Sequence, residues 1–396
     1  MAVEWSQLPP ELVETISKSL KNYIDYLNCR ATCRNWRSSI PQTPSHLPPQ
    51  LPWLMVPQSQ HNSSRRAFFN LSTNKFHFLN LPEASHSNRH CGSSHGWLTI
   101  LDETPTVLLL NPISRANLYL PSLSTFPNVI SFNYSDIGRE YALRNALGDR
   151  FTFSLRQMRD SFIKKLVLSS SPLRDSNFMA VAILNPTGDL AYCKNGDQYW
   201  SIIESTRSFC EDVIYMNGSF FAVNKVGQIA VCDVSCDIAK VSFIETPKQI
   251  GGDMQYLVNS GDDLLLVTKY LDDYFESELP DLHPNLIYRT TRFEVFRLDC
   301  EEIQWVRVRS LGDKTLFIGE NASLALSSMD FPGCVGNCIY FTDDYSVANY
   351  NGHFGEYDLG IFKLWDESFE PFPCYLQASH SRLQWPPPLW VSPNPC

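Results

Sequence analysis

The first 40 residues carry a hydrophobic pattern that predicts three short helices. Pro9 and Pro10 suit a helix start, where a missing backbone N–H costs nothing. The apolar residues that follow at helical spacing are Leu12, Val13, Ile16 and Leu20. A second helix is expected near Asp25, a good N-cap, and a third carries Trp36. Helices this short bury too little surface to fold alone, so the segment either caps a larger domain or completes its core with a partner.

Residues 41–57 are rich in proline and hold the apolar pair Trp53 and Leu54. Proline lacks the backbone N–H that a helical hydrogen bond needs, so this stretch cannot continue the third helix. We therefore expect an extended connector over residues 43–62, pinned in place by its apolar side chains.

Beyond residue 62 the pattern changes to short apolar runs that each follow a turn. The clearest runs begin at Gly96, Gly188, Gly218, Gly261 and Gly336. Second runs are expected at residues 107–110, 229–233, 293–299 and 361–365. A turn–strand–strand–strand unit that recurs every few tens of residues is typical of a β-propeller. The uneven spacing leaves an array of β-sandwiches as the alternative.

We expect six blades, with residues 65–80 in the first and residues 389–391 docking back to close the ring. Closure would remove the free sheet edge that otherwise invites aggregation. Residues 122–164 fit the repeat poorly and indicate an insertion. Residues 271–283 hold five acids and no lysine or arginine, which is typical of an exposed loop.

Composition sets the compartment and the broad class. The 396 residues are 43% apolar, which is ample for a large core. No run of 18 apolar residues exists, so no membrane helix is expected. The N-terminus lacks the pattern of basic and then apolar residues that marks a secretory leader, so secretion is not expected. The 12 scattered cysteines fit reduced thiols in a cytoplasmic and/or nuclear protein.

The charge of the chain argues against nucleic acid as the main ligand. The net charge is −10, and the first 40 residues are nearly balanced, so the acidic excess lies in the larger domain. A soluble acidic surface explains that excess more simply than a basic substrate does.

Candidate catalytic and metal motifs are explained better as structure. The string Gly92-Ser93-Ser94-His95-Gly96 matches G-x-S-x-G, but a strand is expected after it where a nucleophile elbow needs a helix. The histidines and cysteines lack paired C-x-x-C spacing, so no metal and no cofactor is expected. The acid pairs 262–263, 272–273 and 343–344 fit turns, and no enzyme activity is expected.

The N-terminal helices resemble an F-box, the motif that binds the Skp-family adaptor of cullin-type ubiquitin ligases. The residues that carry the resemblance are Trp5, Ser6, Leu8, Pro9, Glu11, Leu12, Ile16, Leu20, Asp25, Arg30, Ala31, Cys33, Arg34, Trp36 and Arg37. The resemblance implies that most of the adaptor contact comes from Leu8, Pro9, Leu12, Ile16 and Leu20. It also implies a second set of residues that holds the three helices together and borders the adaptor contact. They are Leu27, Cys33 and Trp36. The departures from the motif are Asn28, Cys29 and Thr32.

Strings in the larger domain resemble plant F-box proteins whose C-terminal domain was long catalogued only as a domain of unknown function. They include Cys91-Gly92-Ser93-Ser94-His95-Gly96-Trp97-Leu98, Asp212-Val213-Ile214-Tyr215 and Gly336-Asn337-Cys338-Ile339-Tyr340-Phe341. This resemblance implies a kelch-like propeller. The expected fold is a small all-α F-box of three helices (residues 1–42), the connector (43–62) and an all-β propeller (63–396).

These resemblances imply a substrate-recognition subunit of an SCF (cullin-type) E3 ubiquitin ligase. The F-box would bind the Skp-family adaptor, and through it the cullin and RING subunits, while the propeller binds an unknown protein target for ubiquitination. The alternative is a binding or inhibitor protein that acts without ubiquitination. Long polar or aromatic segments at residues 122–129, 271–285 and 346–357 are candidates for the target-facing surface.

Overall fold

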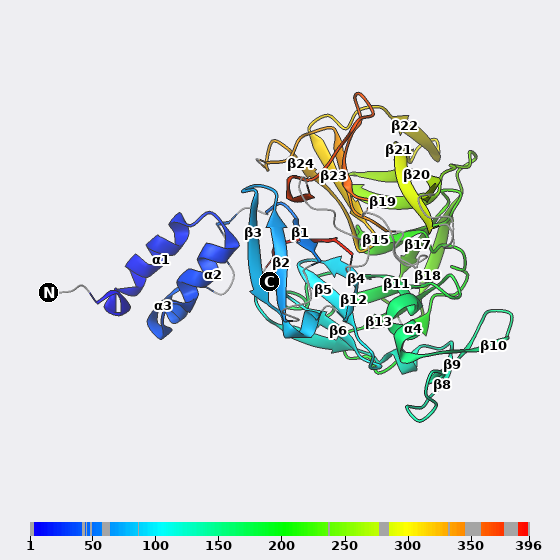
Figure 1. Cartoon of the computed structure of the whole chain (residues 1–396), viewed down its shortest axis with the longest axis horizontal. Helices are drawn as coiled ribbons and strands as arrows, with labels where there is room; N and C mark the ends of the chain where they lie inside the picture. Colours follow the sequence, from blue (N-terminus) through cyan, green and yellow to red (C-terminus); the bar gives the residue numbers. More distant parts are fainter. Residues whose placement is uncertain are drawn as a thin grey trace.

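The computed structural model describes residues 4–41, 44, 46–47, 50–57, 64–85, 87–236, 238–276, 285–331, 333–344, 358–375 and 387–394. In this part of the chain, short N-terminal helices lead into an all-β domain (Figure 1). The predicted order of a small helical segment followed by a large β domain is therefore confirmed.

The N-terminal helices begin where the prolines predict. They are the 3-10 turn η1 (Trp5–Gln7), α1 (Pro10–Ser19), α2 (Tyr23–Ala31) and α3 (Arg34–Ser39). The prediction that Asp25 caps the second helix is wrong. Asn22 is the N-cap, because its side-chain oxygen accepts a hydrogen bond from the Asp25 backbone N–H at 2.8 Å. Asp25 lies inside the first turn, where a carboxylate favours the helix dipole.

Six of the described sheets have four or five strands. The first sheet has the strand order β28 (Leu389–Val391), β1 (Trp53–Val56), β2 (Arg65–Asn70) and β3 (Lys75–Asn80). The second sheet has the order β4 (Arg89–Ser94), β5 (Trp97–Leu101), β6 (Val107–Leu110) and β7 (Asn117–Leu120). The third sheet has the order β11 (Ile163–Leu168), β12 (Met179–Leu184), β13 (Asp189–Lys194) and β14 (Ser201–Ile202). The fourth sheet has the order β15 (Asp212–Met216), β16 (Ser219–Val223), β17 (Ile229–Asp233) and β18 (Lys240–Ile244).

The last two large sheets and one small sheet complete the domain. The large ones are β19 (Met254–Ser260), β20 (Asp263–Glu276), β21 (Asn285–Asp299) and β22 (Gln304–Val308), and then β24 (Ala322–Ser327), β23 (Lys314–Gly319), β25 (Cys338–Phe341), β26 (Gly360–Lys363) and β27 (Phe369–Glu370). The small sheet is β10 (Arg150–Phe153), β9 (Tyr141–Arg144) and β8 (Val129–Phe132). Short helical turns are η2 (Pro82–Ala84), η3 (Leu123–Thr125), α4 (Leu155–Gln157), η4 (Met158–Phe162) and η6 (Pro373–Tyr375).

The innermost strands of the six larger sheets form a closed ring. Around the axis, β28, β4, β11, β15, β19 and β24 each contact the next, and β24 returns to β28. This arrangement is a β-propeller, in which twisted sheets are placed around a central axis and each packs face to face on its neighbours. The six larger sheets agree with the expected six blades, and that count stays a prediction.

The ring is closed by a strand near the end of the chain, as the sequence predicted. Strand β28 pairs antiparallel with β1, with Leu54 opposite Trp390. The Trp390 side chain is fully buried, and its Nε1–H donates to the Ile318 carbonyl oxygen at 3.0 Å. The Asn321 amide donates to the Trp390 carbonyl at 2.7 Å and accepts from its N–H at 3.3 Å. One short strand therefore joins the first sheet to the last.

A buried carboxylate at the axis ties four sheets together. Asp212 begins β15, and its Oδ1 lies 2.6 Å from the Lys165 ammonium of β11. Its Oδ2 accepts from the Leu257 backbone N–H of β19 at 2.9 Å and from the Ser323 hydroxyl of β24 at 3.2 Å. Asp212 and Lys165 are only 2% and 4% exposed. The carboxylate is thus satisfied by a cation and by donors from the neighbouring inner strands.

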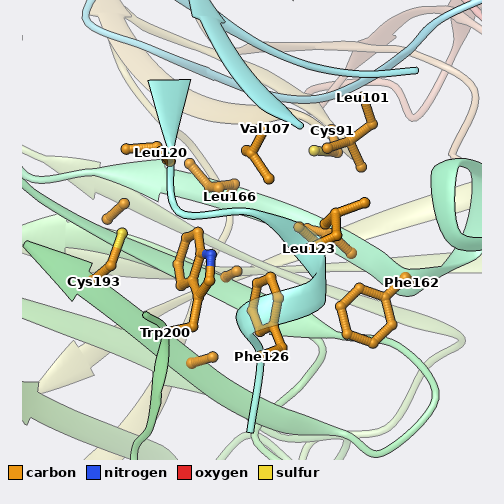
Figure 2. Packing of buried hydrophobic residues seen from close by; sticks show 14 of the residues in the cluster. Cys91, Leu101, Val107, Leu120, Leu123, Phe126, Phe162, Leu166, Cys193 and Trp200 are labelled. Atoms are coloured by element: carbon orange, nitrogen blue, oxygen red, sulfur yellow. The ribbon is translucent and has the colours of Figure 1, made fainter. Parts of the chain in front are cut away.

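Residues 122–129, expected to be a target-facing loop, instead enter the core. The Leu123 and Phe126 side chains are buried between the second and third large sheets (Figure 2). Phe126 stacks on Trp200 with ring centroids 4.5 Å apart and meets Phe162 edge to face at 5.1 Å. The segment's aromatic content reflects this burial, so it is not a free binding loop.

Two other expectations about loops change. Residues 271–276, expected in an exposed loop, belong to strand β20, whose Glu276 lies opposite Asn285 of β21. Aromatic and branched residues favour this extended pairing despite the acids between them. Residues 277–284 and 346–357 lie outside the described residues.

Trp53–Val56, inside the predicted connector, forms strand β1 and pairs with β2.

Removing the buried indole of Trp390 tests the ring closure. We expect Trp390→Ala to lower the free energy of unfolding by about 3–5 kcal/mol, because the cavity and the lost hydrogen bond weaken both the first and the last sheet. Urea unfolding of the full chain measures this change. A loss below about 1 kcal/mol would contradict a closing role, since surface positions typically change stability by less than that.

The axial ion pair gives a second prediction. Asp212→Ala leaves the Lys165 ammonium buried without its partner, so we expect a loss of about 3–5 kcal/mol in the free energy of unfolding. The matched control removes both charges with Lys165→Met and Asp212→Leu, and it should be more stable than the single variant. Equal stability of the single and double variants would show that burial of an unpaired charge is not the cause.

Candidate adaptor-binding helices

The N-terminal helices have a small core of their own. The buried side chains at its centre are Val13, Tyr23, Tyr26, Ile40 and Leu47. The partly buried side chains packed around them are Leu8, Leu20, Cys29 and Trp36. Burial raises the pKa of the Cys29 thiol, which therefore stays protonated and behaves as a small apolar group. The core depends on Leu47, so the folded unit includes part of the proline-rich stretch.

Hydrogen bonds to backbone oxygens fix the chain entry and exit. The Asn35 amide of α3 donates to the carbonyls of Ser6 and Leu8, both at 3.0 Å. The Trp36 Nε1–H donates to the Trp5 carbonyl at 2.9 Å. At the other end, the Tyr26 hydroxyl donates to the Pro41 carbonyl at 2.8 Å. These bonds hold the entry turn against α3 and tie α2 to the start of the connector.

Helix α1 presents two apolar faces instead of one. Val13 and Ser17, one turn apart, are 0% and 1% exposed and pack inward. Leu12 and Ile16 also lie one turn apart, on a different face. Leu12 is 51% exposed and Ile16 is half-buried. An exposed leucine on a well-packed helix is the feature that a docking partner would cover.

The predicted site residues divide into three groups. Leu8, Leu20 and Trp36 pack against the helical core. Ile16, Leu27 and Cys33 are half-buried, and Pro9 and Leu12 are exposed. Adaptor contact by these residues stays a prediction.

Cys33 has a local role that its spacing did not show. It is the N-cap of α3, and its sulfur accepts a hydrogen bond from the Trp36 backbone N–H at 3.5 Å. Thr32 and Asn28, two departures from the motif, are exposed and linked by a hydrogen bond from the Thr32 hydroxyl to the Asn28 carbonyl at 3.2 Å. They therefore change the surface of α2 and leave its core unchanged.

Trp5 is an exposed apolar residue that the predicted site omitted. Its side chain is 63% exposed in the turn before α1. The motif already begins at this tryptophan, but only the structure shows that its ring stays outside the core while its carbonyl is used by Trp36. Exposed tryptophans are over-represented at the centres of protein interfaces.

The helices are attached to the propeller through α2. Ile24 packs against the core cluster that includes Trp53, Phe68 and Leu79 of the first large sheet. The Asp25 carboxylate faces His77 of β3, where it opposes the lowering of the His77 pKa by burial. Figure 1 shows the helices at the left, beside β2 and β3, and β8–β10 at the lower right of the ring. The helical unit therefore has a defined contact with the propeller.

The G-x-S-x-G string forms a hairpin. Ser94 ends β4, His95 and Gly96 turn the chain with φ values of 54° and 86°, and Trp97 begins β5. A Cβ on Gly96 would lie 2.5 Å from the Asn394 carbonyl oxygen, so only glycine fits. A strand follows the string where a nucleophile elbow needs a helix, as the sequence predicted.

The assignment of the acid pair at residues 343–344 to a turn is wrong, because the two residues lie outside the turns of the structure and are buried. Asp343 and Asp344 are 2% and 4% exposed. The Lys269 ammonium lies 3.7 Å from Asp344 Oδ2 and 3.3 Å from Asp358 Oδ2, and Tyr256 donates its hydroxyl hydrogen to Asp344. Burial raises the pKa of Asp344. This ionic cluster joins the last two sheets.

Two features of the described residues bear on other functions. Among them, no group of three or more histidine, cysteine, aspartate or glutamate side chains is arranged to hold a metal ion. A cavity of about 210 Å³ lies at the axis and is lined partly by Lys165, Tyr215 and Asn259. Its cation is already paired with Asp212. None of the helices in the described ranges is long and apolar enough to cross a membrane.

Comparison with known proteins gives matches over nearly the whole chain. An F-box domain model matches residues 5–46, and the KIB1-4 beta-propeller model matches residues 68–363. F-box protein SKIP23 of Arabidopsis thaliana is 29% identical over 98% of this chain and 96% of its own length. Putative F-box protein At5g55150 of the same plant is 28% identical over 98% of this chain and 97% of its length.

More distant matches are found as well. F-box/kelch-repeat protein At1g64840 of Arabidopsis thaliana is 24% identical over 90% of this chain and 88% of its length. Among solved structures, the Cps50 (Swd1) beta-propeller domain of Myceliophteria thermophila overlaps 81% of this chain and 83% of its own with a TM-score of 0.32 at 12% identity. The two family models together match both the helices and most of the propeller. The chain belongs to the KIB1-4 beta-propeller family and carries an F-box domain at its N-terminal end.

Proposed function

We propose that this protein is a substrate receptor of a cullin-type ubiquitin ligase. Its F-box binds a Skp-family adaptor, and its propeller binds the protein to be ubiquitinated. The receptor performs no bond chemistry. It raises the effective concentration of the target beside a ubiquitin-charged enzyme, which is how tethered modules accelerate a reaction between partners.

The observation that carries the proposal is the exposed apolar face on α1. Leu12 is half exposed although Val13, its neighbour in sequence, is fully buried. Leu12 is 51% exposed, so covering it gains about half of the roughly 1.5–3 kcal/mol of full burial, which corresponds to roughly a fourfold to tenfold gain in affinity. Helix-on-helix docking of such a face is a common recognition mode.

The junction between helices and propeller supports the same role. Ile24 of α2 packs on the first sheet, and Leu47 of the connector packs on the helices. A receptor that presents a target to a distant enzyme gains from a fixed geometry, because a floppy link lowers the effective concentration. The buried apolar contacts at both places limit the relative motion of the two parts.

The second candidate is a binding protein whose F-box does not recruit a ligase. The departures Asn28 and Thr32 favour it, because both lie exposed on α2 and would alter an adaptor contact there. Cys29 gives it no support, since its thiol faces the helical core. A normal affinity for the adaptor would exclude this candidate.

Substitution of Leu12 tests adaptor binding with little effect on folding. We expect Leu12→Ala to weaken binding to a Skp-family adaptor about tenfold, because the variant loses buried apolar area only in the complex. Surface plasmon resonance with immobilised adaptor measures the dissociation constant. Leu8 is a poorer choice, since its side chain packs on the helical core and its loss would also loosen the helices.

Leu173→Ala is the matched control. Leu173 is exposed to a similar degree, 47%, but it lies on the propeller far along the chain from the helices. The control should bind the adaptor like the wild type. Unchanged binding of the Leu12→Ala variant would overturn the proposed docking face, and no binding by the wild-type chain would overturn the ligase role itself.

A further inference from the structure

The small sheet β8–β10 departs from the propeller repeat. It lies in sequence between β7 and β11, in the region expected to hold an insertion. Figure 1 shows its strands projecting from the rim of the ring. In Figure 1 the F-box helices lie at the left of the ring and the small sheet at its lower right, so the two surfaces are well separated.

One face of the small sheet is anchored in the core. Tyr141 and Leu143 of β9 are fully buried, and Phe132, Phe151 and Phe153 from the flanking strands pack partly against the same cluster. This is the cluster around Phe126 and Trp200 in Figure 2. The sheet is therefore a fixed extension of the propeller, and its second face is held outward in a defined geometry.

The outward face pairs two like charges. Arg144 of β9 lies directly opposite Arg150 of β10, and both side chains are exposed. Like charges directly opposite one another destabilise a strand pair. Across the described part of the chain, neither guanidinium has a carboxylate partner. This chain has a net charge of −10, so an unneutralised arginine pair is a local exception.

The acids nearest to the arginines are already engaged. Asp149 accepts a hydrogen bond from the Asn145 amide at 3.0 Å, within the turn between β9 and β10. Asp136, in the turn between β8 and β9, accepts from the Asn133 amide at 3.2 Å. These bonds order the turns and turn the carboxylates toward their own loops. The acids keep their charge but are held within the turns, and the exposed guanidinium groups of Arg144 and Arg150 stay available on the outward face.

The strand that carries Arg150 has a free edge. Within the described residues, β10 pairs only with β9, so its outer backbone N–H and C=O groups have no strand partner. Strand β8, at the other edge, is interrupted by a register shift next to Ile130, which blunts it for pairing. Beside β10, the turn presents Leu147, whose side chain is 85% exposed.

We propose that β10 binds an extended acidic segment of a partner protein, added as a fourth strand to the small sheet. The segment's backbone would pair with the free edge of β10, and its carboxylates would reach the guanidinium groups of Arg144 and Arg150. Arginine forks bind carboxylates through two parallel N–H···O bonds, which gives both strength and orientation. An apolar residue of the segment would cover Leu147.

This mode of binding explains features that the propeller alone does not. Strand addition uses main-chain hydrogen bonds for affinity and side chains for selectivity, so it needs a free edge and a distinctive charge pattern together. The arginine pair destabilises the isolated sheet but becomes favourable when carboxylates lie between the two cations. The surface does not depend on the adaptor, so it extends the proposed function without resting on it.

The probe is a fluorescein-labelled peptide of alternating glutamate and valine, titrated with the full chain and followed by fluorescence anisotropy. We expect saturable binding that weakens as salt is raised, because the contacts are between exposed charges. A peptide of alternating lysine and valine should not bind. The glutamate peptide N-methylated at alternate amides should lose binding, since it keeps its charge but cannot pair as a strand.

Arg150→Glu separates binding from folding. It places a glutamate opposite Arg144, which removes the repulsion, so the variant should melt at a temperature at or above that of the wild type. The same change should weaken the glutamate peptide about tenfold. Arg309→Glu is the matched control, because Arg309 is also exposed and lies after β22 on a distant sheet. It should leave peptide binding unchanged.

Any of four outcomes would overturn the proposal. The first three are wild-type affinity in the Arg150→Glu variant, equal binding of the N-methylated peptide, and equal loss of binding in the Arg309→Glu control. Binding of an oligouridylate in place of the peptide, with the same sensitivity to Arg150→Glu, would show that the arginines serve nucleic acid and would overturn it too. None of these measurements involves an adaptor, so their failure is distinct from failure of the ligase role.

Discussion

Closure of the ring is the constraint on which the rest of the structure depends. A propeller sheet buries both of its faces against its neighbours, so every sheet needs two flanking sheets and the ring has no natural end. Here Trp390 and its hydrogen bonds to Ile318 and Asn321 hold the first and last sheets together. At the axis, Asp212 links the inner strands of four sheets.

The position of the F-box also depends on closure of the ring. Strand β1, which receives β28, lies inside the proline-rich stretch, and Leu47, earlier in the same stretch, completes the helical core. Ile24 of α2 packs on the sheet that β28 completes. The orientation of the F-box helices is thus built on the strand pairing that closes the ring, although the two lie at opposite ends of the chain.

The sequence predicted much of this fold because its signals are local. A glycine turn followed by an apolar run marks a hairpin, and the runs at residues 97–101, 107–110 and 229–233 are the strands β5, β6 and β17. The motif of the F-box likewise placed its helices to within two or three residues. The exposed Leu12 and the core residue Leu20 both belong to the predicted set.

What the sequence did not show depends on contacts between distant residues. Asp343 and Asp344 look like turn residues until Lys269, far along the chain, is placed beside them. Residues 122–129 look like a polar loop until Phe126 meets Trp200. Strands β23 and β25 pair in parallel, which no hairpin signal predicts, because the connecting segment passes from one end of the sheet to the other. Helix α2 begins earlier than expected, because its N-cap is Asn22 and not Asp25.

The late position of β28 also governs how the protein is made. Chains fold from the N-terminal end as they leave the ribosome, and the F-box helices and β1 emerge long before residues 389–391. Until then, the inner edge of β1 is unpaired and its apolar residues lack their cover. Synthesis therefore passes through a stage in which the ring is open and the edge of β1 is exposed, and this edge is covered only when β28 has been made.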